Sequence, residues 1–85
     1  MAEKTNADKI NAELKMVAIE LSSAMDHHQP MHNAHEAYSV ILEELDEFWQ
    51  EVKLKREQRN RVNIRTELRQ IAAMAVRAVI DLDLK

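Results

Sequence analysis

With 85 residues and a net charge of −3, the chain is long enough for one domain with a thin core, and its acidity argues against a protein that coats nucleic acid. It has no cysteine, which excludes a disulfide framework and a thiolate zinc site, and no apolar run near the ~18 residues of a membrane-spanning helix. Because the N-terminus also lacks a secretory pattern, we expect a single cytoplasmic domain over residues 1–85, with no membrane contact.

The first predicted helix lies between a capping sequence and Pro30. The chain has no glycine and one proline, and strong helix formers are abundant, so we expect an all-α fold. Thr5 supplies a capping hydroxyl, and Asp8 places an acid in the first turn. Pro30 ends the helix, because the residue before proline is pushed out of the α region. A stripe at helical spacing follows the cap: Ile10, Leu14, Val17, Leu21 and Met25.

The second predicted helix opens at Asn33, where Glu36 three residues later completes a variant of the capping box. We expect it to run to about Arg56, and to be followed by a break between residues 58 and 63. Without glycine, Asn60 or Asn63 is the best candidate for a left-handed turn. The apolar stripe of this helix is Tyr38, Ile41, Leu45, Phe48 and Val52.

The third predicted helix continues to the end of the chain and completes a small bundle. Its apolar stripe is Ile64, Leu68, Ile71, Ala72, Ala75, Val79 and Leu82. Four further apolar residues, Met16, Trp49, Met74 and Ile80, lie away from the centres of the stripes. One three-helix unit leaves part of this apolar surface wet, so we expect a homo-oligomer, a dimer or tetramer, to complete the core.

The segment from Glu43 to Glu47 places four carboxylates in five residues within the second helix. On a helical wheel with Glu44 at zero, Glu47 falls at roughly −60° and Glu51 at roughly −20°, beside an apolar stripe that begins at roughly 40°. Carboxylates that border a core need a partner. The candidates are a metal ion, arginines or another subunit; the alternative is an ordinary salt-bridged helix surface.

The third helix carries a second pair of oxygen-bearing side chains, Glu67 and Gln70, which again flank the apolar stripe. Residues three apart on a helix are surface neighbours. If the second and third helices pack antiparallel, the two pairs can face each other across a narrow gap. Three carboxylates and an amide oxygen suit a hard cation such as Mg²⁺.

These residues resemble the pattern of the MazG-like all-α nucleoside triphosphate pyrophosphohydrolases, which have E-E-x-x-E on one helix and E-x-x-D on the next. The match covers about residues 33–84 and includes HEAYSVILEELDEFWQEV. This region is similar to the small stand-alone members of the family found in phage and bacterial genomes. The resemblance implies Mg²⁺-dependent hydrolysis, with Mn²⁺ as a substitute, of a nucleoside or deoxynucleoside triphosphate to the monophosphate and pyrophosphate.

The resemblance also assigns roles to single residues. It implies that Glu44, Glu47 and Glu67 are metal ligands and that Glu43 is a supporting catalytic acid, while a metal-activated water attacks the α-phosphorus. Gln70 stands where the family has aspartate. A neutral amide there lowers the negative charge of the site and should weaken metal affinity, unless Glu51 supplies charge from the next turn.

The residues that contact the substrate are less well defined. A basic stretch runs from Lys53 to Arg69, and within it Lys53 and Arg56 are the best candidates for contact with the triphosphate; a solvated helix end is the alternative. Nucleic acid is an unlikely partner because no known motif accompanies the charge. The histidines are spaced too irregularly for a zinc site, and His35 is the best placed of them to touch base or ribose.

Two alternatives to an active pyrophosphohydrolase stay open. One is a related nucleotide-binding or regulatory subunit, catalytically weakened at Gln70. The other is a helical interaction module that has no enzymatic activity, with an acidic edge that pairs with a basic partner. Trp49 and Tyr38 can stack on a nucleobase, although aromatic residues at helical spacing are more often part of a core or an interface.

Overall fold

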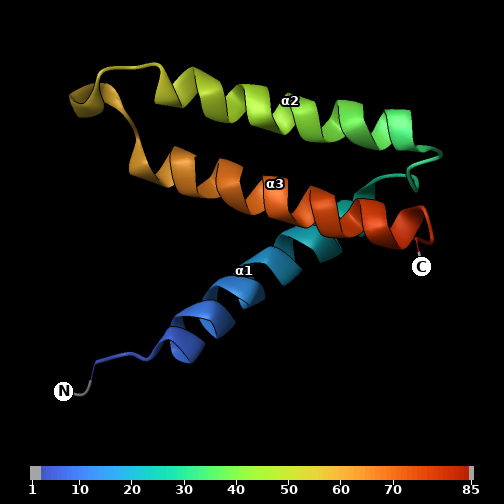
Figure 1. Cartoon of the computed structure of the whole chain (residues 1–85), viewed down its shortest axis with the longest axis horizontal. Coiled ribbons are helices and arrows are strands. Elements are labelled where there is room, and N and C mark those ends of the chain that lie inside the picture. Colours follow the sequence, from blue (N-terminus) through green and yellow to red (C-terminus); the bar gives the residue numbers. More distant parts are fainter. Residues whose placement is uncertain (1–2, 85) are drawn as a thin grey trace.

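The computed structural model describes residues 3–84, which form three α-helices and no strand (Figure 1). The helices are α1 (Asn6–His27), α2 (Ala34–Val52) and α3 (Arg61–Asp81), and a short 3₁₀ turn, η1 (Arg56–Gln58), lies between α2 and α3. The prediction of an all-α fold with three main helices is confirmed. No helix in this part of the chain is long and apolar enough to span a membrane.

Side chains cap the start of each helix and satisfy amide groups that have no partner within the helix. At α1, the hydroxyl of Thr5 accepts from the amide of Asp8, and the carboxylate of Asp8 accepts from the amide of Thr5, each at 3.1 Å. At α2, the side chain of Asn33 accepts from the amide of Glu36 at 2.8 Å. Asn60 caps α3 in the same way. The sequence therefore determines where the helices begin.

The connection between α2 and α3 differs from the sequence prediction. Helix α2 ends at Val52, not at about Arg56, and Asn60 has a φ of −96° and not the left-handed conformation. The side chain of Glu51 accepts a hydrogen bond from the amide of Asn60, and this bond connects the end of α2 to the start of α3. Residues 53–60 are all exposed, so a longer α2 would bury nothing.

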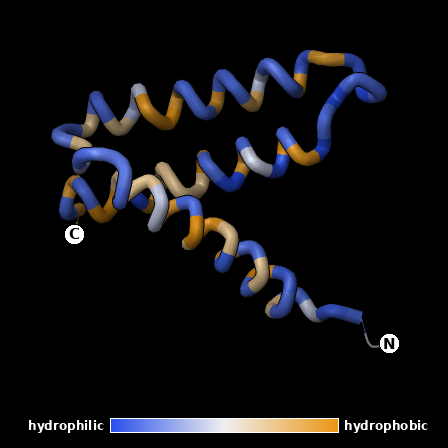
Figure 2. The backbone as a smooth tube through the Cα atoms, turned by 180° about the vertical axis from the view of Figure 1, so that it is seen from behind, coloured by the Kyte–Doolittle hydropathy of each residue, from blue (hydrophilic) through white to orange (hydrophobic). Residues whose placement is uncertain are grey.

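Helices α2 and α3 lie side by side and run in opposite directions, whereas α1 crosses α3 at a wide angle and extends away from the pair (Figures 1 and 2). The radius of gyration is 14.8 Å. A compact domain of this length has a radius of gyration of about 12 Å. The arrangement is therefore open, and α1 causes much of the excess.

The hydrophobic core is small and lies where α1 and α2 meet the C-terminal half of α3. Its buried apolar residues are Met31, Ala37, Ala73, Met74 and Ala78. Met74 is buried although it was predicted to lie away from the centre of the apolar stripe of α3. Leu68 and Val79 were predicted to lie within that stripe, but they are half exposed. The reason is that α3 packs against α2 on one flank and α1 on another, so that its buried face is not the centre of its apolar stripe.

A buried ion pair anchors the loop between α1 and α2 to α3. Arg77 is 6% exposed, and its Nε lies 3.2 Å from Oδ2 of Asp81, whose side chain is 5% exposed. The guanidinium donates to the carbonyl oxygen of Gln29 at 2.6 Å, and the carboxylate accepts from the amide of Met31 at 2.9 Å. The two charges therefore hold the backbone on both sides of Pro30.

Candidate metal centre

Three carboxylates from two helices meet between α2 and α3. Glu44 and Glu47 are one turn apart on α2, and α3 brings Glu67 beside them. One oxygen of each side chain lies within 4.8 Å of the others, which is close enough for a single ion to contact all three. The antiparallel packing of α2 and α3 thus produces the juxtaposition that the helical wheels predicted.

Two oxygens in this cluster are buried and have no hydrogen-bond partner: Oε2 of Glu44 and Oε2 of Glu67. A buried polar atom without a partner is costly, and a charged one more so. A buried carboxylate oxygen without a partner therefore lies on each of the two facing helices. These orphaned atoms, and the all-oxygen donor set, fit a hard divalent cation such as Mg²⁺.

The cluster also changes the acidity of its members. Burial, followed by the negative charges of Glu47 and Glu67, raises the pKa of Glu44 to about 7. The pKa of Glu67 is raised as well, first by burial and then by Glu47. Like charges that cannot all ionise together favour the protonated form, and a bound cation reverses this preference.

The other acidic candidates of α2 occupy different positions. Glu43 is exposed beside Glu44, and Glu51 is engaged with the backbone of Asn60, so Glu51 does not supply the charge that Gln70 lacks. Gln70 is half-buried, one turn beyond Glu67 on α3. It lies next to the carboxylates and lines the cavity that adjoins them.

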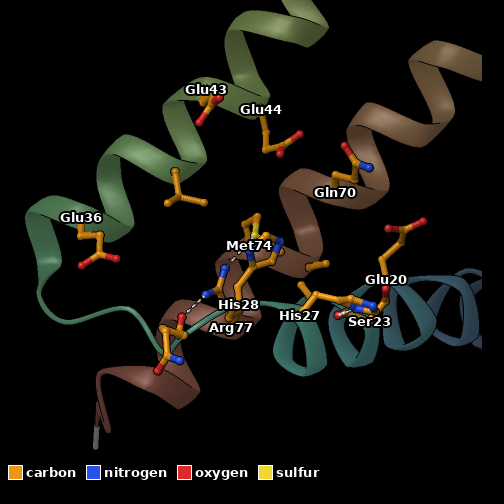
Figure 3. A pocket seen from close by; sticks show the side chains of 14 residues that line it. Glu20, Ser23, His27, His28, Glu36, Glu43, Glu44, Gln70, Met74 and Arg77 are labelled. Carbon is orange, nitrogen blue, oxygen red and sulfur yellow. Dashed lines mark hydrogen bonds between the residues drawn. The ribbon is translucent and has the colours of Figure 1, made fainter.

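A cavity of about 730 Å³ extends from Glu44 towards the loop between α1 and α2. Figure 3 shows its walls: residues of α2 on one side, residues of α3 along the floor, and the C-terminal end of α1 opposite. This volume is in the range of pockets that hold small organic ligands. The labelled lining residues are Glu20, Ser23, His27, His28, Glu36, Glu43, Glu44, Gln70, Met74 and Arg77.

The predicted substrate contacts lie outside this cavity. Lys53 and Arg56 are exposed in the connection between α2 and α3, and His35 is exposed at the start of α2. Of the four histidines, His27 and His28 line the cavity, and His35 does not. Trp49 and Tyr38 are 56% and 68% exposed and do not line it.

Sequence reasoning missed two cavity residues, Glu20 and Arg77. Glu20 is half-buried beside Leu21 of the α1 stripe, so the argument that singled out Glu44 applied to it too. Arg77 and Asp81 are four residues apart and flank the buried Ala78, a pattern that resembles an ordinary surface ion pair. Among residues 3–84 the histidines form no group that could hold a metal ion.

No protein-family model, curated protein or solved structure matches this chain. The resemblance to the MazG-like enzymes therefore remains a hypothesis drawn from the residues of α2 and α3. The observations that bear on function are the carboxylate cluster, its orphaned oxygens and the adjoining cavity.

Proposed function

We propose that this protein is a divalent-cation-dependent pyrophosphohydrolase of the MazG-like type, which converts nucleoside or deoxynucleoside triphosphates to monophosphates and pyrophosphate. The observation that carries the proposal is the pair of buried, unpartnered oxygens of Glu44 and Glu67, which come from facing helices; Glu44 also lines a cavity in the size range of small organic ligands. In an ordinary salt bridge the carboxylate oxygens contact a cationic side chain, whereas neither of these two oxygens has a partner.

The metal ligands in this proposal are Glu44, Glu47 and Glu67, with the amide oxygen of Gln70 beside them. Bound Mg²⁺ or Mn²⁺ would supply charge neutralisation at the phosphates and an activated water. The protein's own contribution is positional, since two packed helices hold the carboxylates in place before substrate arrives. Glu43, exposed at the rim of the cavity, is the supporting acid.

The triphosphate would extend from the cluster towards the connection between α2 and α3. Lys53 follows Glu47 by six residues, which is about 9 Å along a helix. Both Lys53 and Arg56 are exposed there, where long cationic side chains are able to reach a phosphate.

Self-association belongs to the same proposal. None of the residues of α1 is buried, and its apolar Ile10, Leu14 and Met25, which share one face of the helix, are 56%, 58% and 41% exposed. A contiguous apolar face of this kind marks an interaction surface. A second copy of the chain, in a dimer or tetramer, would cover it.

A nucleotide-binding subunit without turnover is the second candidate, and Gln70 favours it. The amide adds no negative charge to the site, so fewer ions or weaker binding would follow. An acidic interaction module is the third candidate. Stabilisation by Mg²⁺ separates the first two candidates from the third, and turnover separates the first from the second.

The decisive assay is pyrophosphate release from a panel of nucleoside and deoxynucleoside triphosphates with Mg²⁺ or Mn²⁺. The native chain is compared with a Glu44→Gln/Glu67→Gln variant and with Asp46→Asn, which removes an exposed carboxylate from the same helix. We expect metal-dependent release that falls at least about 100-fold in the double variant and is retained by Asp46→Asn. Absence of release from every substrate by well-folded native protein contradicts the enzymatic proposal.

A further inference from the structure

The cavity beside the carboxylate cluster carries an excess of negative charge. Glu20, Glu36, Glu43 and Glu44 all line it, and the charge of Arg77 is matched by the buried Asp81. Glu36 is engaged with His32 at 2.9 Å, which leaves the other three carboxylates facing the cavity without a cationic partner among the residues that line it. A phosphate would be repelled from such a space, whereas a hydrogen-bond donor is favoured.

The polar groups of the cavity are arranged as acceptors on its walls and a donor at its floor. On the wall, Nδ1 of His27 lies 2.7 Å from the carbonyl oxygen of Ser23, and because a carbonyl only accepts, Nδ1 carries the proton. The other ring nitrogen is then an acceptor in the neutral imidazole. Figure 3 shows Glu20 and His27 on the α1 side, across the cavity from Glu43 and Glu44.

The donor at the floor is Arg77, the most deeply buried cationic side chain that the structure describes. Its Nε lies 3.2 Å from the carboxylate of Asp81 and its Nη2 donates to Gln29, but its Nη1 reaches only the sulfur of Met74, at 3.7 Å. Since sulfur is a weak acceptor, the guanidinium keeps hydrogen-bonding capacity for a ligand. A group that offers an acceptor next to a donor would satisfy both the floor and the walls.

The position of the cavity fixes which part of a nucleotide would occupy it. The cavity extends from Glu44 towards the histidine-containing loop, whereas Lys53, Arg56 and the other loop cations lie at the opposite end of the α2–α3 pair (Figure 1). A triphosphate directed to the basic end leaves the nucleoside to fill the cavity.

We infer that this cavity is a nucleobase subsite which selects bases whose Watson–Crick edge has an exocyclic amino group next to an unprotonated ring nitrogen, namely cytosine and adenine. The inference rests on the proposed function. Cytosine and adenine place an N–H₂ donor where uracil and thymine place a carbonyl acceptor. The amino group pairs with the wall carboxylate Glu20, and the ring nitrogen accepts from Arg77. Uracil would set its O4 against a carboxylate, and guanine its O6, leaving buried polar groups unpaired.

The test is an NMR titration of the ¹⁵N-labelled full chain, without metal, with cytidine, adenosine, uridine and guanosine. We expect cytidine and adenosine to shift the amide resonances of Ser23, His28 and Gln70, and to bind about tenfold more tightly than uridine or guanosine. Glu20→Gln is expected to remove most of this preference, because an amide is able to donate to O4 of uracil. Glu57→Gln, an exposed loop acid, serves as the matched control and should keep it.

The outcomes separate this inference from the proposed function. Equal binding of uridine and cytidine, or a preference that survives Glu20→Gln unchanged, overturns the selection of amino-bearing bases. Hydrolysis of triphosphates without any nucleoside-induced shift at the cavity overturns the subsite but leaves the pyrophosphohydrolase intact. Selective binding of cytidine and adenosine by a protein that releases no pyrophosphate supports the subsite and contradicts the enzymatic proposal.

Discussion

Helices α1 and α2 pack against the same helix, α3, but in contrasting ways. Helix α2 lies along α3 in an antiparallel pair and holds two of its acids against Glu67. Helix α1 contacts α3 at Glu13, whose carboxylate accepts from Arg69, and no residue of α1 is buried. The α2–α3 pair, which carries the carboxylate cluster, is therefore held together by helix packing. Helix α1 is held by two anchors, and one of its apolar faces stays uncovered.

The two anchors of α1 differ in strength. At its C-terminal end, the loop to α2 is held by the buried pair of Arg77 and Asp81. Near its middle, Arg69 makes two hydrogen bonds of 2.8 Å to Glu13, whose side chain is 58% exposed. A surface pair contributes little because water screens it, whereas loss of one partner of a buried pair leaves an uncompensated charge.

The largest effect is expected from Arg77→Met. This substitution leaves Asp81 buried without its cation and should lower the free energy of unfolding by about 3–5 kcal/mol. Urea unfolding followed by circular dichroism measures the loss. Arg61→Met, an exposed arginine at the start of the same helix, should change stability by less than about 0.5 kcal/mol.

A second variant shows whether the buried pair or the packing matters. Arg77→Met/Asp81→Leu removes both charges and should recover part of the lost stability, because an apolar replacement of a buried pair is often neutral. If Arg77→Met costs no more than Arg61→Met, then the pair does not anchor the loop between α1 and α2.

The next effect concerns the uncovered face of α1. Leu14→Glu places a charge in the centre of this face and should weaken self-association at least about tenfold. Sedimentation equilibrium measures the dissociation constant. Lys15→Glu reverses the charge of the neighbouring residue and should have a much smaller effect. A native chain that sediments as a monomer at all accessible concentrations contradicts the expected oligomer.

The smallest of the three effects concerns the α2–α3 pair and is the pH dependence of stability that Glu44 causes. The pKa of Glu44 in the folded protein, about 7, lies above its ordinary value. The folded state therefore keeps a proton that the unfolded state releases, so stability falls as the pH rises from about 4.5 to 7. Glu44→Gln should stabilise the protein at pH 8 and not at pH 4.

The expected gain at pH 8 is on the order of 1 kcal/mol, which is less than the full pKa shift implies, because water screens a half-buried group. Thermal unfolding at the two pH values measures it, and Asp46→Asn is the control. Saturating Mg²⁺ should remove the fall in stability of the native chain between pH 4.5 and 8. A pH profile that Glu44→Gln leaves unchanged would show that the three carboxylates do not interact.

The local features of this fold could be predicted from the sequence. Helix type, the caps at Thr5 and Asn33, and the placement of Glu44 beside Glu47 follow from periodicity and capping chemistry. The end of α2 could not, because it depends on a hydrogen bond from the amide of Asn60 to Glu51, nine residues away.

The buried face of α3 and the floor of the cavity could not be predicted for a related reason. Which flank of α3 is buried depends on where α1 crosses it, and no local pattern specifies that crossing. Arg77 and Asp81 have the spacing of a solvated ion pair, and only the tertiary packing shows that they are buried. His35 was predicted to be the histidine nearest the substrate, but His27 lines the cavity. The sequence does not specify how the C-terminal end of α1 lies relative to α2.

The central claim is that Glu44, Glu47 and Glu67 form one divalent-cation site, and isothermal titration with Mn²⁺ tests it most directly. At pH 7 we expect the native chain and Asp46→Asn to bind Mn²⁺ with release of protons, since the partly protonated Glu44 must ionise to act as a ligand. The Glu44→Gln/Glu67→Gln variant should show no binding. Equal binding by this variant, or no binding by the well-folded native chain, would contradict the account.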